Sequence, residues 1–587
     1  MLNDIKKTIS LYLKSKINLD EAQIYNLLEV PKVYEHGHLS LPLFQMAKLE
    51  KTNPMELAKN LQAQIEKEYS EKLGSEKLGS EELQSKNRIN YGIEKVQAVG
   101  GYLNITLQSS FFQENVVSGI LSKKQIGFSQ EGVGQKVAVD FSSPNVAKPM
   151  HVGHLRATMI GNAICNLAES QGYEVLSINH LGDWGSQFGK LAWAYKQWGS
   201  EYDFSERPID AFLKIYIRFH EEAEKDPTLV QKGTEQFRRL EEGDLETRQI
   251  WELIIKYSMA DFSRLYKILG IHHKFVLGES FYNDKLEDVV QRLKDKNLLQ
   301  ESEGAQVVFF DEKENMPPCL IKKSDGASIY ATRDLAAAIY RHEEMKAHKL
   351  LYVVGQDQTL HFKQVFRVLE KMGYEWAKEM FHITFGLYRF KDGKLSTRQG
   401  KIVLFEDILN QSMDLVREMI EEKNPNLNHK ELVTQQVAIG AVIFNDLVND
   451  RSKNVEFDWD RAISIEGDSG PYVQYTVVRC RSLMRKFGKP VKESFETLLQ
   501  SPEEQKLLFR LLQLDHVLKI SFNHFKPNFL AQYLLEVCSD FSHFYHAHRI
   551  LGESEAIESS RMTLVLATEK ILTQGLQILG IPTPDEM

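Results

Sequence analysis

The sequence is poor in cysteine and places none of it in a metal-binding or disulfide pattern. Its 587 residues include only four cysteines, Cys165, Cys319, Cys480 and Cys538. They stand far apart along the chain and no CxxC pair is present, which argues against a structural zinc site and against a disulfide framework. We therefore expect no structural zinc and a reducing compartment.

Long apolar runs are also missing. No stretch approaches the roughly 18 consecutive apolar residues that a membrane span requires. Residues 1–16 are amphipathic and interrupted by lysines, unlike a secretory signal peptide. These absences predict a cytoplasmic protein that does not bind a membrane.

The sequence also lacks an excess of basic residues. The net charge of −9 excludes a globally basic nucleic-acid binder but leaves room for a local basic face. Hydrophobic residues make up 42% of the chain and charged residues 26%, which is ordinary for a globular protein. A chain of this length exceeds one hydrophobic core, so three or four domains are expected.

The hydrophobic pattern divides the chain into three parts. Residues 1–125 combine short amphipathic helices with a hairpin around a Gly-Gly turn at 96–107, which predicts a small α+β domain. Residues 126–430 alternate strand and helix patterns. Strand signals end after residue 430, so 431–587 is predicted to be all-α. Its expected helices cover 436–447, 472–486, 502–522, 528–548 and 559–579.

The middle part predicts an α/β domain. A buried-strand run at 137–141 is followed by a helix over 151–171 and a strand at 174–178, and such a βαβ unit implies a parallel sheet. Further strands are expected at 350–354 and 382–386. The helix-rich, highly charged residues 186–300 are expected to form insertions between the sheet's two halves.

The most informative motif is His151-Val152-Gly153-His154, where the first predicted strand leads into the helix. Open α/β sheets bind ligands at strand carboxyl ends and helix N-termini. Gly153 lets a nucleotide base lie close to the backbone, and the imidazoles of His151 and His154 can donate to phosphate oxygens. With Lys148 beside it, this turn predicts a Rossmann-type nucleotide-binding catalytic domain with helical insertions.

A second motif, KLSTRQGK at 394–401, is a polar, cationic loop next to glycine. Such loops hold polyphosphate through lysine charge and backbone N–H groups. Together with the HVGH turn, Lys394 and Ser396 predict an enzyme that acts on the α-phosphate of ATP. Thr397 leaves open which second cation contacts the transition state, and Lys148 and Lys401 are the candidates.

These two motifs resemble the HIGH-type and KMSKS-type signatures of class I aminoacyl-tRNA synthetases. Other segments resemble the arginyl-tRNA synthetase family in particular: FSSPNVAKPMH at 141–151, LGDWG at 181–185, DGASIYATRD at 325–334 and GPYVQY at 470–475. The resemblance covers essentially the whole chain. It implies a Rossmann-type catalytic domain, a small N-terminal α+β domain that contacts tRNA and an all-α anticodon-binding domain.

The resemblance implies a two-step ligase reaction. L-Arginine would attack the α-phosphate of ATP, with Mg²⁺ bridging the phosphates, to form arginyl-adenylate and pyrophosphate. The terminal ribose of tRNA-Arg, through its 2′-OH, would then accept the arginyl group. The family further implies that adenylate formation requires bound tRNA, and we expect a monomer. By this resemblance His151, His154, Lys394 and Lys148 are catalytic.

The resemblance also implies an arginine site made of Asp140, Asn145, Tyr330, Asp334 and Gln358. The first two would hold the α-amino group and carboxylate region, and the other three the guanidinium. Tyr330 and Asp334 stand four apart on a predicted helix and so share one face. A carboxylate can pair bidentately with guanidinium. The alternative for Asp334 is a salt bridge to Arg333 or Arg341.

The helical tail has a local basic stretch with aromatic residues before it. Arg479, Arg481, Arg485, Lys486, Lys489 and Lys492 fall within 479–492, which contains no acid. Tyr472 and Tyr475 precede them at i, i+3 spacing. Composition alone allows a solvated helix with core tyrosines, whereas the family resemblance assigns Tyr472, Tyr475, Arg479 and Arg481 to tRNA, since aromatic rings stack on unpaired bases. It also places Asn104 at the tRNA elbow.

Three other functions remain open. The chain could be a class I synthetase for another amino acid, such as cysteine or glutamine, against which Tyr330 and Asp334 argue. It could be a small-molecule nucleotidyltransferase, although those chains are usually short and lack a helical RNA-binding tail. It could be a non-catalytic RNA-binding paralogue, against which the intact His151, His154 and Lys394 argue.

Overall fold

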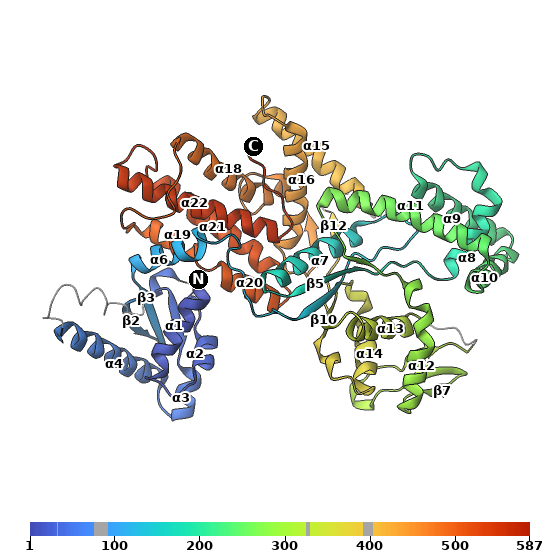
Figure 1. Cartoon of the computed structure of the whole chain (residues 1–587), viewed down its shortest axis with the longest axis horizontal. Coiled ribbons are helices and arrows are strands. Elements are labelled where there is room, and N and C mark those ends of the chain that lie inside the picture. The colour runs from blue at the N-terminus through green and yellow to red at the C-terminus, as the bar shows by residue number, and fades with distance from the viewer. Residues whose placement is uncertain (32, 76–91, 325–328, 391–402) are drawn as a thin grey trace. The chain divides into compact units, whose positions relative to one another are not determined.

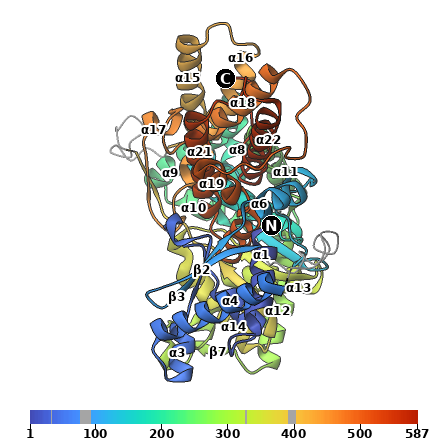
Figure 2. The ribbon, with the colours of Figure 1, turned by 90° about the vertical axis from the view of Figure 1, so that its left-hand side faces the viewer.

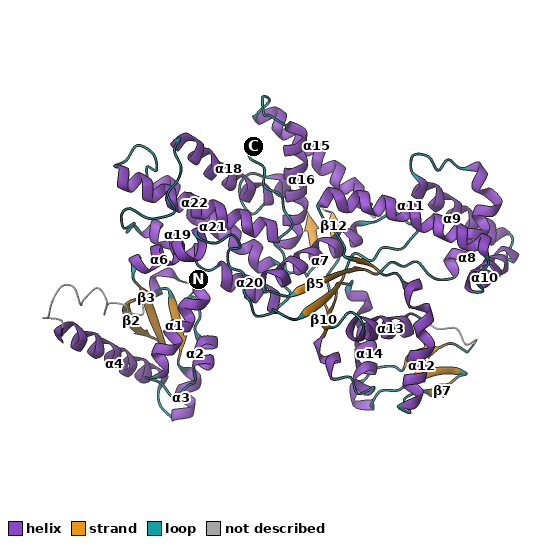
Figure 3. Cartoon of the chain, in the orientation of Figure 1, coloured by secondary structure: helices purple, strands orange, loops and turns teal. Residues whose placement is uncertain are grey.

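The computed structural model describes residues 1–31, 33–75, 92–324, 329–390 and 403–587. Two compact units make up the chain, and Figure 3 shows that helices predominate in it. Unit 1 contains residues 1–128, 475–520 and 532–575, and unit 2 contains residues 129–474, 521–531 and 576–587. Lys394 and Ser396 of the second motif, with Lys401, lie outside the described residues.

The core of unit 2 is a five-stranded sheet in the order β11-β10-β4-β5-β6, and every neighbouring pair is parallel. The strands are β4 (Lys136–Asp140), β5 (Glu174–Asn179), β6 (Phe275–Val276), β10 (Ala347–Tyr352) and β11 (Met380–His382). The order reverses between β4 and β10. Open α/β sheets bind their ligands at the carboxyl ends of strands at such a switch point.

Helix α7 (Val152–Ser170) joins β4 to β5 and packs on both strands, and Figure 1 shows it beside β5. A Cβ on Gly161 would lie 2.3 Å from the side chain of Phe141, so only glycine permits this close approach. Arg156 of α7 is buried and pairs with the equally buried Asp446 at 3.0 Å. Its guanidinium also donates to the carbonyl oxygens of Gly386, Arg451 and Lys453. The predicted βαβ unit is confirmed, and α7 is anchored at its first turns.

Two insertions interrupt the sheet. The first consists of α8 (Ser186–Trp198), α9 (Pro208–Lys225), α10 (Thr228–Glu241) and α11 (Leu245–Leu269). The second contains α12 (Leu286–Asp295) and an antiparallel sheet of β7 (Gln300–Ser302), β8 (Ala305–Val308) and β9 (Cys319–Lys322). In Figure 1 the first group lies apart from α12 and β7. The insertions are therefore confirmed, but β6 separates them.

The chain after the second insertion continues unit 2. Helix α13 (Tyr330–Glu343) precedes β10, and α14 (Thr359–Lys371) lies between β10 and β11. Three more helices follow: α15 (Phe405–Lys423), α16 (Lys430–Leu447) and α17 (Trp459–Ile463). The strand expected at 382–386 ends at His382, although Gly355 and Phe385 still form an isolated bridge.

The prediction that no strand follows residue 430 is wrong. Strand β13 (Val455–Phe457) pairs in parallel with β12 (Tyr388–Phe390). Each strand has three residues, which is too short to produce a recognisable alternation, and their partners lie far apart in the sequence.

The N-terminal part of unit 1 contains the antiparallel sheet β1-β3-β2. The strands are β1 (Leu39–Pro42), β2 (Ile93–Val99) and β3 (Tyr102–Leu107), and the helices are α1 (Leu2–Lys14), α2 (Glu21–Leu27), α3 (Phe44–Glu50), α4 (Pro54–Ser75) and α6 (Ser109–Val116). The predicted hairpin is confirmed, with positive φ at Gly100 and Gly101. Helix α4 packs on β2 and β3, which Figure 2 shows from the side.

The C-terminal helices are α18 (Gly470–Phe487), α19 (Pro502–Leu511), α20 (Leu514–Asn523), α21 (Asn528–Ala547) and α22 (Glu555–Ile578). The prediction of a single helix over 502–522 is wrong, because the helix is interrupted between the end of α19 at Leu511 and the start of α20 at Leu514. The Tyr533 hydroxyl lies 3.0 Å and 3.3 Å from the carbonyl oxygens of Arg510 and Leu511, and the Leu2 N–H donates to the carbonyl of Leu512. These distant partners satisfy carbonyls that a continuous helix would have bonded.

None of the helices in the described ranges is long and apolar enough to cross a membrane. All four cysteines are free and buried.

Candidate active site

The HVGH turn orients both of its imidazoles through the backbone. His151 is the N-cap of α7, and its Nδ1 accepts a hydrogen bond from the Gly153 N–H at 3.1 Å. The His151 N–H in turn donates to Nδ1 of His154, also at 3.1 Å. Because each Nδ1 accepts a backbone hydrogen bond, a neutral ring must carry its proton on Nε2. Each histidine can therefore offer an Nε2–H group to a ligand.

Both imidazoles are neutral at pH 7. Desolvation, with a smaller contribution from His151, lowers the pKa of His154 to about 3. Desolvation and the neighbouring charge of Lys148 also lower the pKa of His151. The Lys148 Nζ lies 5.6 Å from the centroid of the Tyr216 ring. The turn thus combines two uncharged hydrogen-bond donors with one lysine cation, a combination that suits phosphate oxygens.

The loop that leads from β4 into the turn is strained. Ser142, Ser143 and Ala147 have φ values of 69°, 47° and 65°. Non-glycine residues at positive φ cost about 1–3 kcal/mol each and persist only where the surroundings hold them. Helix α11 supplies that hold, because the Ser142 and Tyr266 hydroxyls lie 2.7 Å apart and the Ala147 N–H donates to Ser258 at 3.0 Å.

The chain that follows the KLSTR motif returns to the HVGH turn. The Val152 N–H donates to the carbonyl oxygen of Val403 at 3.0 Å, and the Phe405 N–H donates to that of Met150 at 3.0 Å. His151 and Leu404 form an antiparallel bridge between these bonds. The HVGH turn is therefore hydrogen-bonded to residues 403–405, which follow the second motif in the sequence.

Asp140, at the end of β4, already has a cationic partner. Its carboxylate pairs with Arg341 of α13 at 2.7 Å and accepts from the Ser143 hydroxyl at 2.8 Å. Burial alone would raise the pKa of Asp140, but Arg341, His180 and Ser143 outweigh it and hold the pKa below its usual range. The structure thus gives Asp140 a role in holding the sheet to α13.

Asn145 is exposed, and its loop is hydrogen-bonded to the LGDWG segment. The Val146 N–H donates to the Gly182 carbonyl at 3.2 Å, and the Gly182 N–H donates to Pro144 at 3.1 Å. A Cβ on Gly182 would lie 2.4 Å from Asn145 Oδ1. Glycine at 182 therefore makes room for the Asn145 side chain.

Helix α13 begins at Tyr330, which is 66% exposed, and carries Asp334 one turn later. Asp334 Oδ2 lies 2.5 Å from His361 Nε2 of α14. The alternative pairing of Asp334 with Arg333 or Arg341 is not observed. Arg341 pairs instead with Asp140, and Arg333 lies 3.8 Å from Glu279. Gln358, just before α14, is exposed.

Glu279 is an acidic residue of this site that the sequence analysis missed. Its side chain is only 14% exposed, and the nearest cationic atom is Arg333 Nη1 at 3.8 Å. Among the described residues its Oε2 has no hydrogen-bond partner. Burial raises the pKa of Glu279 to about 8, with Arg333 opposing and Asp334 and Asp183 adding to the rise. Glu279 and Asp334 are thus neighbouring acids, and in the part of the chain that the structure describes Glu279 has no cationic group closer than Arg333. Nothing in the local sequence pattern marks Glu279.

The tail residues expected to bind tRNA differ in their surroundings. The Arg479 guanidinium lies 4.9 Å and 5.1 Å from the ring centroids of Tyr475 and Tyr545. Arg481 instead pairs with Glu569 of α22 at 2.9 Å, and both side chains are mostly buried. Tyr472 is half-buried at the start of α18. Arg479 with its two rings is the better candidate surface for a nucleic acid.

Asn104 faces the interior of the N-terminal sheet. It is buried in β3, and its Oδ1 accepts from the Ser40 hydroxyl of β1 at 2.7 Å. This side chain therefore links two strands. In the described part of the chain, no group of three or more His, Cys, Asp or Glu residues could hold a metal ion.

Three family models match the chain. The model for "tRNA synthetases class I (R), catalytic domain" matches residues 116–459, "DALR anticodon binding domain" matches 473–587, and "Arginyl tRNA synthetase N terminal domain" matches 3–79. Together they span most of the chain.

Among curated proteins, the chain is 42% identical over 586 residues to "Arginine--tRNA ligase" of Clostridium botulinum (strain Alaska E43 / Type E3), and the match covers 100% of both. It is 42% identical over 588 residues to "Arginine--tRNA ligase" of Clostridium perfringens (strain 13 / Type A), again over 100% of both. Among solved structures, the arginyl-tRNA synthetase of Thermus thermophilus has a TM-score of 0.82 at 24% identity and full coverage of both chains. That of Plasmodium falciparum has a TM-score of 0.76 at 23% identity, covering 100% of this chain and 98% of the other.

Proposed function

The chain belongs to the arginyl-tRNA synthetase family, and from that premise we propose how its residues divide the work. The reaction is that of an arginine–tRNA ligase. L-Arginine and ATP form arginyl-adenylate and pyrophosphate, and the arginyl group is then transferred to tRNA-Arg with release of AMP. We assign the acceptor on the terminal ribose as the 2′-OH.

The histidines of the turn stabilise the transition state at the α-phosphate. The arginine carboxylate attacks phosphorus in line, the bond to pyrophosphate breaks, and negative charge grows on the non-bridging oxygens. The Nε2–H groups of His151 and His154 donate to those oxygens, and Gly153 leaves room for the nucleotide. The tautomer fixed by the two backbone hydrogen bonds supports this assignment most strongly, because the donors are oriented before ATP binds.

Lysine charge neutralises the remaining phosphate oxygens. We assign Lys148 to the α-phosphate side, since it lies beside the turn and lowers the pKa of His151. Lys394 and Ser396 are proposed for the pyrophosphate side. Mg²⁺ is proposed to enter bound to ATP and would neutralise phosphate charge, because Mg²⁺ usually keeps several waters and binds substrate phosphates with only one or two carboxylates. The imidazole N–H groups of His151 and His154 and the ammonium group of Lys148 would then contact phosphate oxygens that are not bound to Mg²⁺.

The arginine side chain is proposed to bind between α13 and the segment after β6. Asp334 and Glu279 supply the carboxylates for the guanidinium, with Tyr330 and Gln358 beside them. Asn145 is proposed for the α-amino group. Asp140, at the end of β4, is proposed to lie at the same end of the arginine molecule as Asn145. Its carboxylate is already paired with Arg341.

Transfer RNA is proposed to bind through Tyr472, Tyr475 and Arg479, with stacking on the aromatic rings and charge from the arginine. Arg481 and Asn104 are weaker members of that set, because Arg481 pairs with Glu569 and Asn104 is buried.

We propose an N-terminal tRNA-contacting domain over 1–125, a catalytic domain over 126–430 and an anticodon-binding domain over 431–587. We propose that the protein acts as a cytoplasmic monomer and that adenylate formation requires bound tRNA.

Arginine-dependent ATP–pyrophosphate exchange, measured with and without tRNA-Arg, tests this function. Exchange should require L-arginine, and it should be slow until tRNA-Arg is added. Exchange that ignores tRNA would remove the tRNA requirement alone. Charging of tRNA with any other amino acid in preference to arginine would contradict the assigned arginine site.

A further inference from the structure

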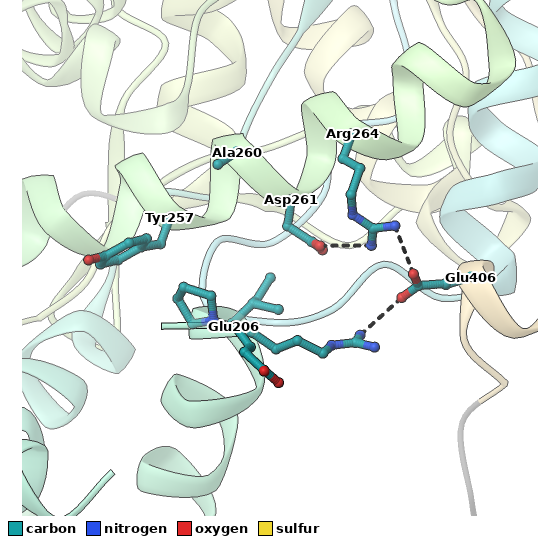
Figure 4. A pocket seen from close by; sticks show the side chains of 9 residues that line it. Glu206, Tyr257, Ala260, Asp261, Arg264 and Glu406 are labelled. Carbon is teal, nitrogen blue, oxygen red and sulfur yellow. Dashed lines mark hydrogen bonds and ion pairs between the residues drawn. The ribbon is translucent and has the colours of Figure 1, made fainter. Parts of the chain in front are cut away.

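The acidic side chain at the start of α15, Glu406, receives two arginines from the first helical insertion. Arg264 Nη1 of α11 donates to one carboxylate oxygen at 2.7 Å, and Arg207 Nη2, just before α9, donates to the other at 3.0 Å. These residues line a cavity of about 300 Å³ together with Tyr257 and Asp261 (Figure 4). Three helices that are distant in the sequence are therefore joined at one carboxylate.

The two arginines are themselves held by acids on their own helices. Arg264 donates to Asp261 at 3.0 Å, and Arg207 pairs with Asp210 at 2.8 Å. Burial opposes ionisation of Glu406, but the two arginines outweigh it and lower its pKa. An isolated exposed ion pair contributes little to stability. A network that fixes both oxygens of one carboxylate constrains geometry more than a single pair does.

Glu406 is attached directly to the HVGH turn. Its neighbour Phe405 donates its backbone N–H to Met150, and the Leu404–His151 bridge lies next to that bond. Helix α11 holds the same loop from its other side through Ser258 and Tyr266. The contacts form a closed ring: the turn is bonded to the start of α15, Glu406 joins α15 to α11, and α11 is bonded to the loop before the turn.

We propose that Glu406 is a positioning residue for arginine activation, because its pairs with Arg207 and Arg264 lock α15 onto α11 and so hold His151 and His154 in place. The loop inside this ring contains three residues at positive φ, so it stays in its conformation only while the surroundings hold it. A misplacement of about 1 Å at reacting groups can cost roughly 100-fold in rate. The inference rests on the proposed role of the two histidines.

The test is arginine-dependent ATP–pyrophosphate exchange by the full-length Glu406→Gln variant with tRNA-Arg present. We expect kcat to fall about 10- to 100-fold and KM for arginine to change much less, since Asp334 and Glu279, proposed for the guanidinium, lie outside the ring. Asn145, proposed for the α-amino group, stands on the held loop, so a small rise in KM agrees with the proposal. Glu431→Gln is the matched control. Glu431 of α16 pairs with Arg417 of α15 through two bonds, at 3.1 Å and 3.2 Å, and neither residue belongs to the ring. The control should keep normal kcat.

Arg264→Gln provides a second variant that leaves Glu406 paired with Arg207. It should also lower kcat more than it changes KM, and the double variant should lose less than the sum of the two single losses, because both changes remove the Arg264–Glu406 pair. Equal kcat for Glu406→Gln and Glu431→Gln would overturn the proposal. If Glu406→Gln fails to fold, normal kcat in Arg264→Gln overturns it instead. If His154→Ala loses activation but Glu406→Gln keeps full activity, the positioning role of Glu406 is rejected and the proposed function stands. Full activity in His154→Ala would reject both.

Discussion

The backbone N–H of His151 donates to Nδ1 of His154, so the first histidine of the turn sets the orientation of the second. The ring centroids lie 3.9 Å apart, and desolvation keeps both imidazoles uncharged. The turn thus presents two oriented neutral donors. Neutral donors contribute to rate only where charge develops, which is the condition at a reacting α-phosphate.

His154→Ala should lower arginine-dependent exchange by roughly 100- to 1,000-fold, the usual cost of one donor to a developing oxyanion. The affinity for tRNA-Arg should be retained, because the change does not touch the helical tail. Steady-state exchange and a filter-binding titration measure the two effects. Normal exchange in this variant would show that His154 is not a catalytic donor.

Gly153→Ala should make the protein less active without making it less stable. A Cβ at this position would lie 3.0 Å from Cε1 of His151, so the ring must move. Alanine is about 1 kcal/mol more favourable than glycine inside a helix. We expect a lower kcat with an unchanged or higher unfolding midpoint, and a drop in both would mean that the turn itself unfolds.

Arginine binding should depend on pH through Glu279. Its pKa is raised to about 8 in the free protein, so below that pH the guanidinium must displace a proton before it can pair with the carboxylate. KM for arginine should therefore fall as pH rises from about 6.5 to 8 and then level off. Calorimetry in buffers of different ionisation enthalpy should detect proton release at pH 7. Glu279→Gln should abolish the release and flatten the profile; a pH-dependent KM in that variant would point to another group.

The same group has an opposite effect on folding. The folded pKa of Glu279 lies above its unfolded value of about 4.5, so the folded chain binds more protons between these two values. The contribution of Glu279 to stability is largest at acidic pH and is lost as pH rises toward 8. Comparing unfolding midpoints of the parent and Glu279→Gln at pH 6 and pH 8 checks this sign, since the variant should gain most at pH 8.

Arg156→Met should be strongly destabilising, by about 3–5 kcal/mol, because it leaves a buried acid and three carbonyl groups without their donor. Asp446→Asn should cost much less. The guanidinium of Arg156 keeps its three carbonyl acceptors, and its Nε can still donate to the amide oxygen. Burial, opposed by Arg156, raises the pKa of Asp446 to about 6, so the cost of the substitution should be smallest above pH 6, where the parent must keep the buried carboxylate charged. Thermal and urea unfolding of both variants measure the difference; equal losses would contradict the role given to the arginine.

Arg479 and Arg481 should behave differently although they stand two residues apart. Arg479→Gln should weaken tRNA binding and reduce its salt dependence by about one phosphate contact. Arg481→Gln should mainly lower the unfolding midpoint, because it leaves Glu569 without that partner. Binding titrations at several salt concentrations, with unfolding curves, separate the two. Equal effects on affinity would show that Arg481 also reaches the nucleic acid.

Local patterns predicted the parts of the fold that depend on neighbours in the sequence. The strand at 137–141, the helix at 151–171 and the Gly-Gly hairpin were all predicted, because apolar periodicity and turn glycines act within a few residues. The break between α19 and α20 could not be predicted, since it depends on Tyr533 and Leu2, which lie far away in the chain.

The candidate site shows the same division. His151, Gly153 and His154 form a local motif, whereas the pairing of Asp140 with Arg341 joins residues 201 positions apart (341 minus 140). Glu279 carries no motif of its own. Its importance follows only from burial and from the nearness of Asp334, which a single sequence does not reveal.

The burial of every cysteine makes the chain a convenient scaffold for site-specific labelling. Burial raises the pKa of all four thiols, to about 12 for Cys319 and Cys538, so almost no reactive thiolate exists at neutral pH. A single cysteine introduced on an exposed helix would be the one thiol that a maleimide dye modifies quickly. Pairs of such labels could then follow, in the unaltered cysteine background, the distance between the two units as substrates bind.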